Sequence, residues 1–235
     1  MSLIGKVAVI TGATGNLGGA VASRFLQGGA RVALIYQDAA KLEALLSQLP
    51  AGDRLAIQAD VTDEAQVERL MGEVHERLDG PDILLNLVGG YAFGKKVMDL
   101  DLATWQHMMG LNLTSAFLCC KHALRYMLPQ GYGRLVNVSS KVAFDLPAGS
   151  AAYAVAKAGI VTLTTCLAHE LKGTGVSVTA VAPSVIDSQA MREALPKADF
   201  SKWVTPEAIA EAMALLASAE GGAMNGATVP LYGGM

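Results

Sequence analysis

Short apolar runs alternate along the chain with helix-length segments in which apolar residues recur every three or four positions. We expect strands over residues 6–11, 31–36, 54–59, 82–88, 133–138, 175–181 and 227–231, and helices over residues 17–28, 39–48, 63–78, 101–128, 150–172 and 206–218. Runs such as residues 83–88 ("ILLNLV") show no strict polar–apolar alternation, which is typical of strands covered on both faces. The pattern predicts an α/β fold in which a doubly wound parallel sheet of about seven strands carries helices on both faces.

The composition agrees with a globular chain of this class. With 235 residues, 52% hydrophobic and 17% charged, the chain can bury a large core, and we expect one domain over residues 1–235. A net charge of -3 lacks the basic excess of proteins that neutralise nucleic-acid phosphates. The start "MSLIGK" lacks the layout of a signal peptide, and no uncharged apolar run approaches membrane-spanning length. We therefore expect a soluble, cytoplasmic protein whose partners are neither nucleic acid nor membrane.

Neither the cysteines nor the histidines follow a metal-binding pattern. Cys119, Cys120 and Cys166 are odd in number, lack Cys-x-x-Cys spacing and fall in apolar helical stretches, which predicts buried, reduced thiols. The four histidines show no ligand spacing, so we expect no metal site.

A glycine-rich stretch, "TGATGNLGG" at residues 11–19, follows the first predicted strand and opens the first helix. Backbone N–H groups at such a turn can hold a pyrophosphate. Gly12 would form the tight turn, Gly15 would admit the phosphate and Gly18 would let the helix pack on the sheet, with Thr14, Asn16 and Leu17 around them. A glycine-rich turn without a ligand is the alternative on this stretch alone.

Two Tyr-x-x-x-Lys pairs occur in the chain. Tyr153 and Lys157 lie in a predicted helix, where a spacing of four puts both side chains on one face. The pair Tyr91 and Lys95 lies among glycines in a predicted loop and has no fixed face. We therefore take Tyr153 and Lys157 as the functional pair.

Two further polar residues accompany this pair. Ser140 follows the strand expected at 133–138, at the edge where open parallel sheets bind ligands. Asn112 interrupts the apolar helix expected at 101–128, where a helix distortion or a relayed water would satisfy its amide.

In their order and spacing, these residues resemble the short-chain dehydrogenase/reductase family, in its single-domain branch of Rossmann-type proteins, over essentially the whole sequence. The family's catalytic tetrad matches Asn112, Ser140, Tyr153 and Lys157. Further cofactor contacts of the family match Asp60, Val61, Asn86, Val88, Gly89, Pro183, Val185 and Ser188. The resemblance implies an NAD(P)(H)-dependent oxidoreductase that transfers a hydride between nicotinamide and a small-molecule carbonyl or alcohol.

The resemblance also implies a role for each tetrad residue. Tyr153 would be the general acid and base, and Lys157 would lower its pKa and hold the nicotinamide ribose. Ser140 would hydrogen-bond the substrate oxygen, and Asn112 would hold a water that resupplies the proton. The same resemblance implies a homotetramer or homodimer, formed through the long helices at 101–128 and 150–172 and the last strand.

The chain departs from the common pattern of this branch at its glycine loop. The usual pattern has glycine at position 16, where this chain has Asn16, and the spacing with Gly15 is similar to that of dihydropteridine reductases. The stretch 183–204, expected to form a lid over about residues 184–204, resembles the corresponding segment of those enzymes. Pteridine reduction is therefore one alternative, although those enzymes lack the serine found at Ser140. A non-catalytic NAD(P)-sensing protein is another.

Cofactor choice and substrate identity remain open at this level. Tyr36 and Gln37 end the second strand without a charge, and Asp38 either lies one position too late or caps the next helix, so NAD and NADP are not distinguished. The aromatic and apolar residues of the expected loops predict a mostly apolar substrate pocket, and we take its walls to include Tyr91, Phe93, Phe144, Met191 and Trp203.

Overall fold

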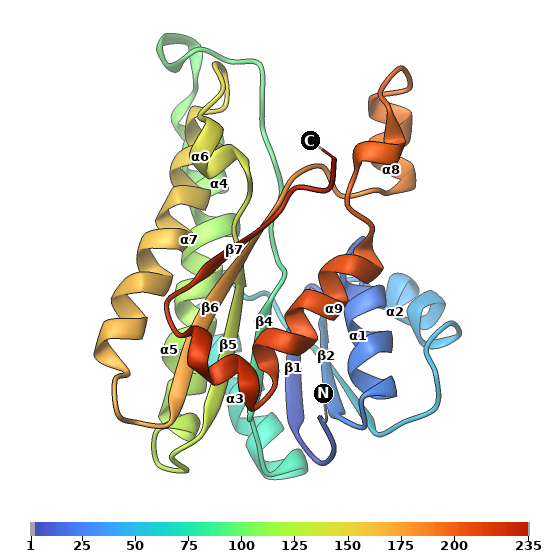
Figure 1. The fold of residues 1–235 in the computed structure, drawn as a ribbon, viewed down its shortest axis with the longest axis vertical. Helices are drawn as coiled ribbons and strands as arrows, with labels where there is room; N and C mark the ends of the chain where they lie inside the picture. The colour runs from blue at the N-terminus through green and yellow to red at the C-terminus, as the bar shows by residue number, and fades with distance from the viewer. Residues whose placement is uncertain (1–2, 235) are drawn as a thin grey trace.

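The computed structural model describes residues 3–234, whose centre is a seven-stranded parallel sheet (Figure 1). Its strands are β1 (Val7–Thr11), β2 (Arg31–Tyr36), β3 (Arg54–Gln58), β4 (Ile83–Asn86), β5 (Gly133–Val138), β6 (Val176–Pro183) and β7 (Thr228–Leu231). They lie in the order β3-β2-β1-β4-β5-β6-β7, and every neighbouring pair is parallel. The predicted fold class is confirmed. The strand order reverses between β1 and β4, and ligands of such sheets bind above this switch point.

Helices cover both faces of the sheet. The described helices are α1 (Gly18–Gln27), α2 (Ala39–Leu46), α3 (Glu64–Leu78), α4 (Leu102–Met109), α5 (Ser115–Met127), α6 (Val142–Asp145), α7 (Ala151–Glu170), α8 (Gln189–Ala194) and α9 (Pro206–Ala217). Short 3₁₀ turns lie at Val97–Asp99, Phe200–Lys202 and Glu220–Met224. Helices α3, α5 and α7 pack on one face, and α1, α2 and α9 pack on the other (Figure 1).

Each face has its own apolar core. In β1, Val7 and Val9 belong to the core under α3, α5 and α7, whereas Ala8 and Ile10 belong to the core under α1 and α9. Successive side chains of a strand point to opposite faces, so a strand buried on both sides must be apolar throughout. This explains why the central strands read as continuous apolar runs.

Helix starts follow capping chemistry. The sequence favours Thr62 as the cap of the helix expected at 63–78 and Thr205 as the cap of the helix expected at 206–218, and the second is confirmed. Thr205 accepts a hydrogen bond from the Ala208 amide and precedes Pro206 at the start of α9. For α3, however, the cap is Asp63, whose carboxylate accepts from the amides of Ala65 and Gln66. Thr62 is occupied elsewhere, because its amide and hydroxyl both donate to the Asp60 carboxylate.

The single helix expected at 101–128 is two helices joined by a π-helical turn at Gly110–Thr114. Asn112 lies within this turn, and its amide nitrogen donates to the Met108 carbonyl at 3.1 Å. The expected distortion at Asn112 is therefore present. A π-turn frees backbone groups at one point of a helix, and such turns are frequent at functional sites.

Two cysteines are buried as expected and the third is not. Cys119 and Cys120 are enclosed, and burial raises the pKa of the Cys120 thiol to about 12. Cys166 is exposed on α7, which contradicts the expectation that it is buried.

Helix α7 is long and apolar enough by length and composition to cross a membrane. In this fold, however, it lies against the sheet and its buried residues include Lys157.

Candidate active site

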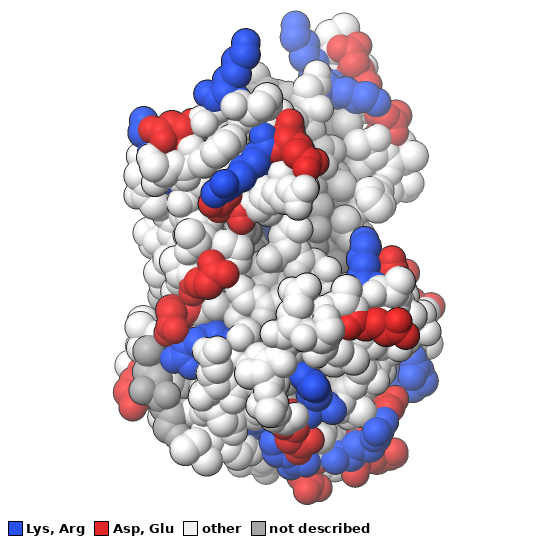
Figure 2. Space-filling view, turned by 90° about the vertical axis from the view of Figure 1, so that its right-hand side faces the viewer, with Lys and Arg blue, Asp and Glu red and all other residues white. Residues whose placement is uncertain are grey.

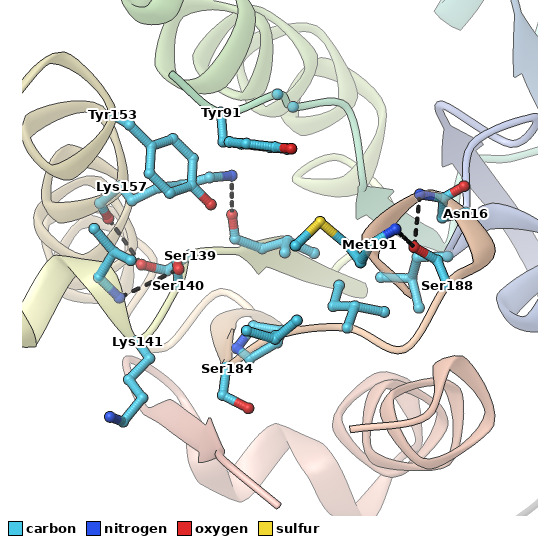
Figure 3. A pocket seen from close by; sticks show the side chains of 18 of the residues that line it. Asn16, Tyr91, Ser139, Ser140, Lys141, Tyr153, Lys157, Ser184, Ser188 and Met191 are labelled. Atoms are coloured by element: carbon cyan, nitrogen blue, oxygen red, sulfur yellow. Dashed lines mark hydrogen bonds between the residues drawn. The ribbon is translucent and has the colours of Figure 1, made fainter. Parts of the chain in front are cut away.

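A cavity of about 670 Å³ opens at the carboxyl edge of the sheet, between the glycine loop, the ends of β4 and β5, the start of α7 and the segment after β6 (Figure 3). Many of the predicted site residues line it: Gly12, Gly15, Asn16, Leu17, Gly18, Gly89, Tyr91, Phe93, Ser140, Tyr153, Lys157, Pro183, Val185, Ser188 and Met191. Val138, Ser139 and Val142 also line the cavity but were not named as site residues from the sequence, whereas Ala194 and Leu195 belong to the lid expected over 184–204. Val138, Ser139 and Val142 flank Ser140 in the sequence, and this proximity is the signal that could have identified them.

The glycine loop has the shape that a pyrophosphate cradle requires. Gly12 has φ +64°, a conformation that favours glycine, and a Cβ on Gly18 would lie 2.2 Å from the Ala13 carbonyl oxygen. Helix α1 begins after Leu17 without a side-chain cap and without an acidic residue in its first turn. The Gly18 amide donates to the Gly15 carbonyl at 3.1 Å. The amides that follow it at the start of α1 can bind an anion, so the residues present fit the phosphates of a dinucleotide.

Tyr153 and Ser140 lie together on the opposite side of the cavity. Tyr153 comes from the first turns of α7, and Ser140 follows β5, where its Oγ accepts from the Val142 amide at 3.2 Å. Burial raises the pKa of Tyr153, and its hydrogen bond with Ser140 partly opposes that rise. The ring of Phe93 lies 5.9 Å from the Tyr153 ring, centroid to centroid. Tyr153 is therefore a protonated phenol at neutral pH.

Lys157 is buried one helical turn beyond Tyr153. Its Nζ donates to the Val138 carbonyl at 2.8 Å, and burial lowers its pKa to about 8. The ammonium lies 5.9 Å from the centroid of the Tyr153 ring. The pKa of Tyr153 is raised, which differs from the lowering of this pKa that was expected from Lys157. Ser139 fixes this part of α7 against β5, because its Oγ donates to the Lys157 carbonyl at 2.8 Å.

Asn112 closes the back of the site without lining the cavity. Its Oδ1 accepts from the Gly90 amide at 3.1 Å, which ties the π-turn to the loop after β4. A Cβ added to Gly89 would lie 2.8 Å from Asn112 Oδ1 and 3.2 Å from Lys157 Nζ. Ser140, Tyr153 and Lys157 thus line the cavity, and Asn112 lies behind Gly89 on the same side as Lys157.

Other predicted residues lie outside the cavity wall: Thr14, Tyr36, Gln37, Asp60, Val61, Asn86, Val88, Phe144 and Trp203. Asn86 is buried in the sheet and donates to Asn137 Oδ1 at 2.9 Å. The Asp38 carboxylate accepts from the amides of Ala40 and Lys41, so it caps α2. Trp203 is buried against Phe200, and Phe144 is exposed outside the wall, so neither reaches the cavity. The Tyr91–Lys95 pair lies in a loop without regular structure, as expected.

Comparison with known proteins gives consistent matches. The family model described as short chain dehydrogenase matches residues 6–199. The meso-2,3-butanediol dehydrogenase of Serratia marcescens is 34% identical, over 97% of this chain and 94% of that protein. A short-chain dehydrogenase/reductase structure from Serratia marcescens BCRC 10948 has a TM-score of 0.92 at 31% identity, covering 100% of this chain and 99% of the other. The structure of levodione reductase has a TM-score of 0.91 at 29% identity, covering 98% and 97%.

These relatives are named as dehydrogenases or reductases, and they do not favour the pteridine-reductase or sensor alternatives. The chain therefore belongs to the short-chain dehydrogenase/reductase family and is an NAD(P)-dependent oxidoreductase that acts on CH–OH and C=O groups.

Proposed function

We propose that this enzyme reduces a small, mostly apolar ketone or diketone, with Tyr153 as the proton donor. The observation that carries the proposal is the convergence of Tyr153, Ser140 and Lys157 on one cavity beside the glycine loop. The raised pKa of Tyr153 supports the reductive direction, because reduction needs a tyrosine that still holds its proton.

When it is bound, the nicotinamide supplies the hydride that adds to the carbonyl carbon. Tyr153 Oη gives its proton to the carbonyl oxygen, so that an alcohol forms and a tyrosinate remains. Ser140 Oγ hydrogen-bonds the same oxygen as negative charge develops there. The Lys157 ammonium, charged below pH about 8, stabilises the tyrosinate until a proton from solvent restores the phenol. Asn112 holds the Gly90 amide and thereby positions the loop beside Lys157.

The walls around this centre support an apolar substrate. Tyr91, Phe93, Val142, Met191 and Leu195 all line the cavity. The names of two relatives contain a 2,3-butanediol and a dione, which supports small diols and diones as the substrate class. We take residues 184–204 as the lid segment that closes this cavity within a single-domain enzyme.

For the cofactor, we infer that no charged side chain at the end of β2 selects between NADH and NADPH. Tyr36 and Gln37 carry no charge there, and the Asp38 carboxylate is engaged with two backbone amides of α2. A carboxylate would bond the ribose hydroxyls of NADH, whereas a guanidinium would bind the 2′-phosphate of NADPH. We expect the two dissociation constants to lie within about tenfold of each other, which is ~1.4 kcal/mol.

A substrate panel tests this function. Each cofactor is titrated by fluorescence, and nicotinamide absorbance is then followed with acetoin, diacetyl, a cyclic dione, simple ketones and charged keto acids. We expect turnover to be fastest with the uncharged diketones. Turnover confined to the keto acids would contradict the apolar assignment, and a preference above a hundredfold for either cofactor would contradict the cofactor inference.

A further inference from the structure

The lid segment is attached to the molecule mainly at its base. Ser184 donates its amide to the Leu231 carbonyl and Lys202 accepts from the Gly234 amide, both at 3.0 Å. Between these points lies α8, none of whose residues is buried (Figure 1). Burial of an apolar face is what normally holds a short helix in place, so α8 must be positioned by other contacts.

One hydrogen bond provides such a contact. Among the described residues, the hydrogen bonds of residues 188–199 join partners within the lid segment, with one exception. The exception is the bond from Asn16, whose Nδ2 donates to Ser188 Oγ at 3.4 Å (Figure 3). Both residues line the cavity, and they are 172 positions apart in the sequence. The glycine loop and the lid segment are therefore joined directly at the cavity wall.

The bonding of Ser188 limits what it can offer a ligand. A serine hydroxyl has two acceptor positions and one proton to donate. Ser188 Oγ accepts from Asn16 Nδ2 and also from the Met191 amide at 3.3 Å, where it caps α8. Both acceptor positions are occupied, so Ser188 is left with its proton for an acceptor oxygen in the cavity.

We propose that Asn16 is a positioning residue that latches the lid segment to the glycine loop through Ser188. The latch holds α8, with Met191, over the cavity and leaves the Ser188 hydroxyl as a donor. Because Asn16 belongs to the loop that fits the cofactor phosphates, cofactor binding and lid position are coupled, and this coupling acts equally in both directions. The kinetic part of the test rests on the proposed function, whereas its proteolytic part does not.

Limited trypsin digestion tests the latch without turnover. Lys197 and Lys202 are exposed in the lid segment, and Lys96 in the loop after β4 is an internal reference. Released peptides are quantified by mass spectrometry for the wild type and for Asn16→Ala, Ser188→Ala and the control Ser201→Ala, whose hydroxyl bonds only within the lid segment. We expect lid cleavage relative to Lys96 to rise about two- to fivefold in the first two variants and to be unchanged in the control. A rise of this size corresponds to the free energy that one exposed hydrogen bond contributes.

Steady-state kinetics with the cofactor present distinguish a change in lid position from a general loss of protein stability. We expect Asn16→Ala and Ser188→Ala each to raise KM for the carbonyl substrate with a smaller change in kcat. The double variant should be no worse than Ser188→Ala alone, because both substitutions remove the same contact. Ser188→Thr keeps a hydroxyl and should restore the wild-type KM and lid protection.

Two results would overturn the latch. One is lid cleavage in Asn16→Ala at the wild-type rate, and the other is full additivity of the two alanine substitutions. Failure of the proposed function is distinguishable, since a protein with no turnover on the panel would still show the proteolytic difference between Asn16→Ala and Ser201→Ala.

Discussion

At the scale of single residues, Gly89 lies where an added side chain would meet two residues of the tetrad. Its missing Cβ makes room for Asn112 Oδ1 and Lys157 Nζ, at 2.8 and 3.2 Å from where that carbon would lie. We predict that Gly89→Ala lowers kcat by about tenfold or more while the protein stays folded, since a displacement near 1 Å in an active site has effects of this size. The control is Gly110→Ala, where an added Cβ meets nothing within 4 Å. Equal activity of the two variants would show that Gly89 has no such role.

Lys157 gives a prediction about pH. Its pKa in the folded chain is about 8 against an ordinary 10.5, so between these values the unfolded chain binds more protons. The free energy of unfolding should therefore rise from pH 8 to 10.5, by up to about 3 kcal/mol at ~1.4 kcal/mol per pKa unit. Denaturant unfolding across this range should show the rise in the wild type and a smaller one in Lys157→Met. Identical pH profiles would mean that Lys157 titrates as an ordinary surface lysine.

At the scale of elements, Arg134 joins three parts of the fold at the edge of the sheet opposite the cavity. From β5 its guanidinium donates to the carbonyls of Gly133, Gly175 and Ser218, and Ser218 ends α9. A cation at the carboxyl end of a helix is favoured by the helix dipole. We predict that Arg134→Met lowers the free energy of unfolding by about 2–4 kcal/mol, because it leaves buried carbonyls without a donor. A loss below half a kilocalorie would contradict this role, whereas Arg125→Met, an exposed ion-pair partner of Glu68, should cost little.

The elements also show what the sequence could predict and why. Strands buried on both faces and long amphipathic helices have strong patterns, so the sheet and the main helices were predictable, and so was the distortion at Asn112. Helix α8 buries no residue and leaves no periodic signal, which is why residues 183–204 read as an irregular loop. The cap of α3 was assigned one residue early, because Thr62 and Asp63 are both good caps and only the fold shows that Asp60 engages Thr62.

The same reasoning applies to the site. The helical spacing of Tyr153 and Lys157, and the place of Ser140 after a strand, predicted three residues of one site, and all three line one cavity. The raised pKa of Tyr153 and the Asn16–Ser188 contact depend on burial and on a meeting of distant segments, which no local pattern encodes.

At the scale of the whole molecule, exposed charged and exposed apolar side chains lie on different parts of the described surface. The face shown in Figure 2 carries Lys, Arg, Asp and Glu side chains intermixed. By contrast, Phe117 on α5 and Val155 on α7 are 45% and 44% exposed, and the edge of β7 has no strand beside it in the described chain. We infer that copies of the chain pair through α5 and α7, and through the free edge of β7. Light scattering after size exclusion should show a dimer or tetramer that Phe117→Glu dissociates, and a monomeric wild type would contradict the inference.

The central claim is that Tyr153 is the proton donor in a nicotinamide-dependent reduction. The most direct test is the Tyr153→Phe variant, measured both for NADH binding by fluorescence titration and for turnover of the best diketone by nicotinamide absorbance. We predict a dissociation constant close to that of the wild type and a fall in kcat of about 10²–10⁴-fold, the usual contribution of a general acid. A Tyr153→Phe variant that turns over the diketone at the wild-type rate would contradict the claim.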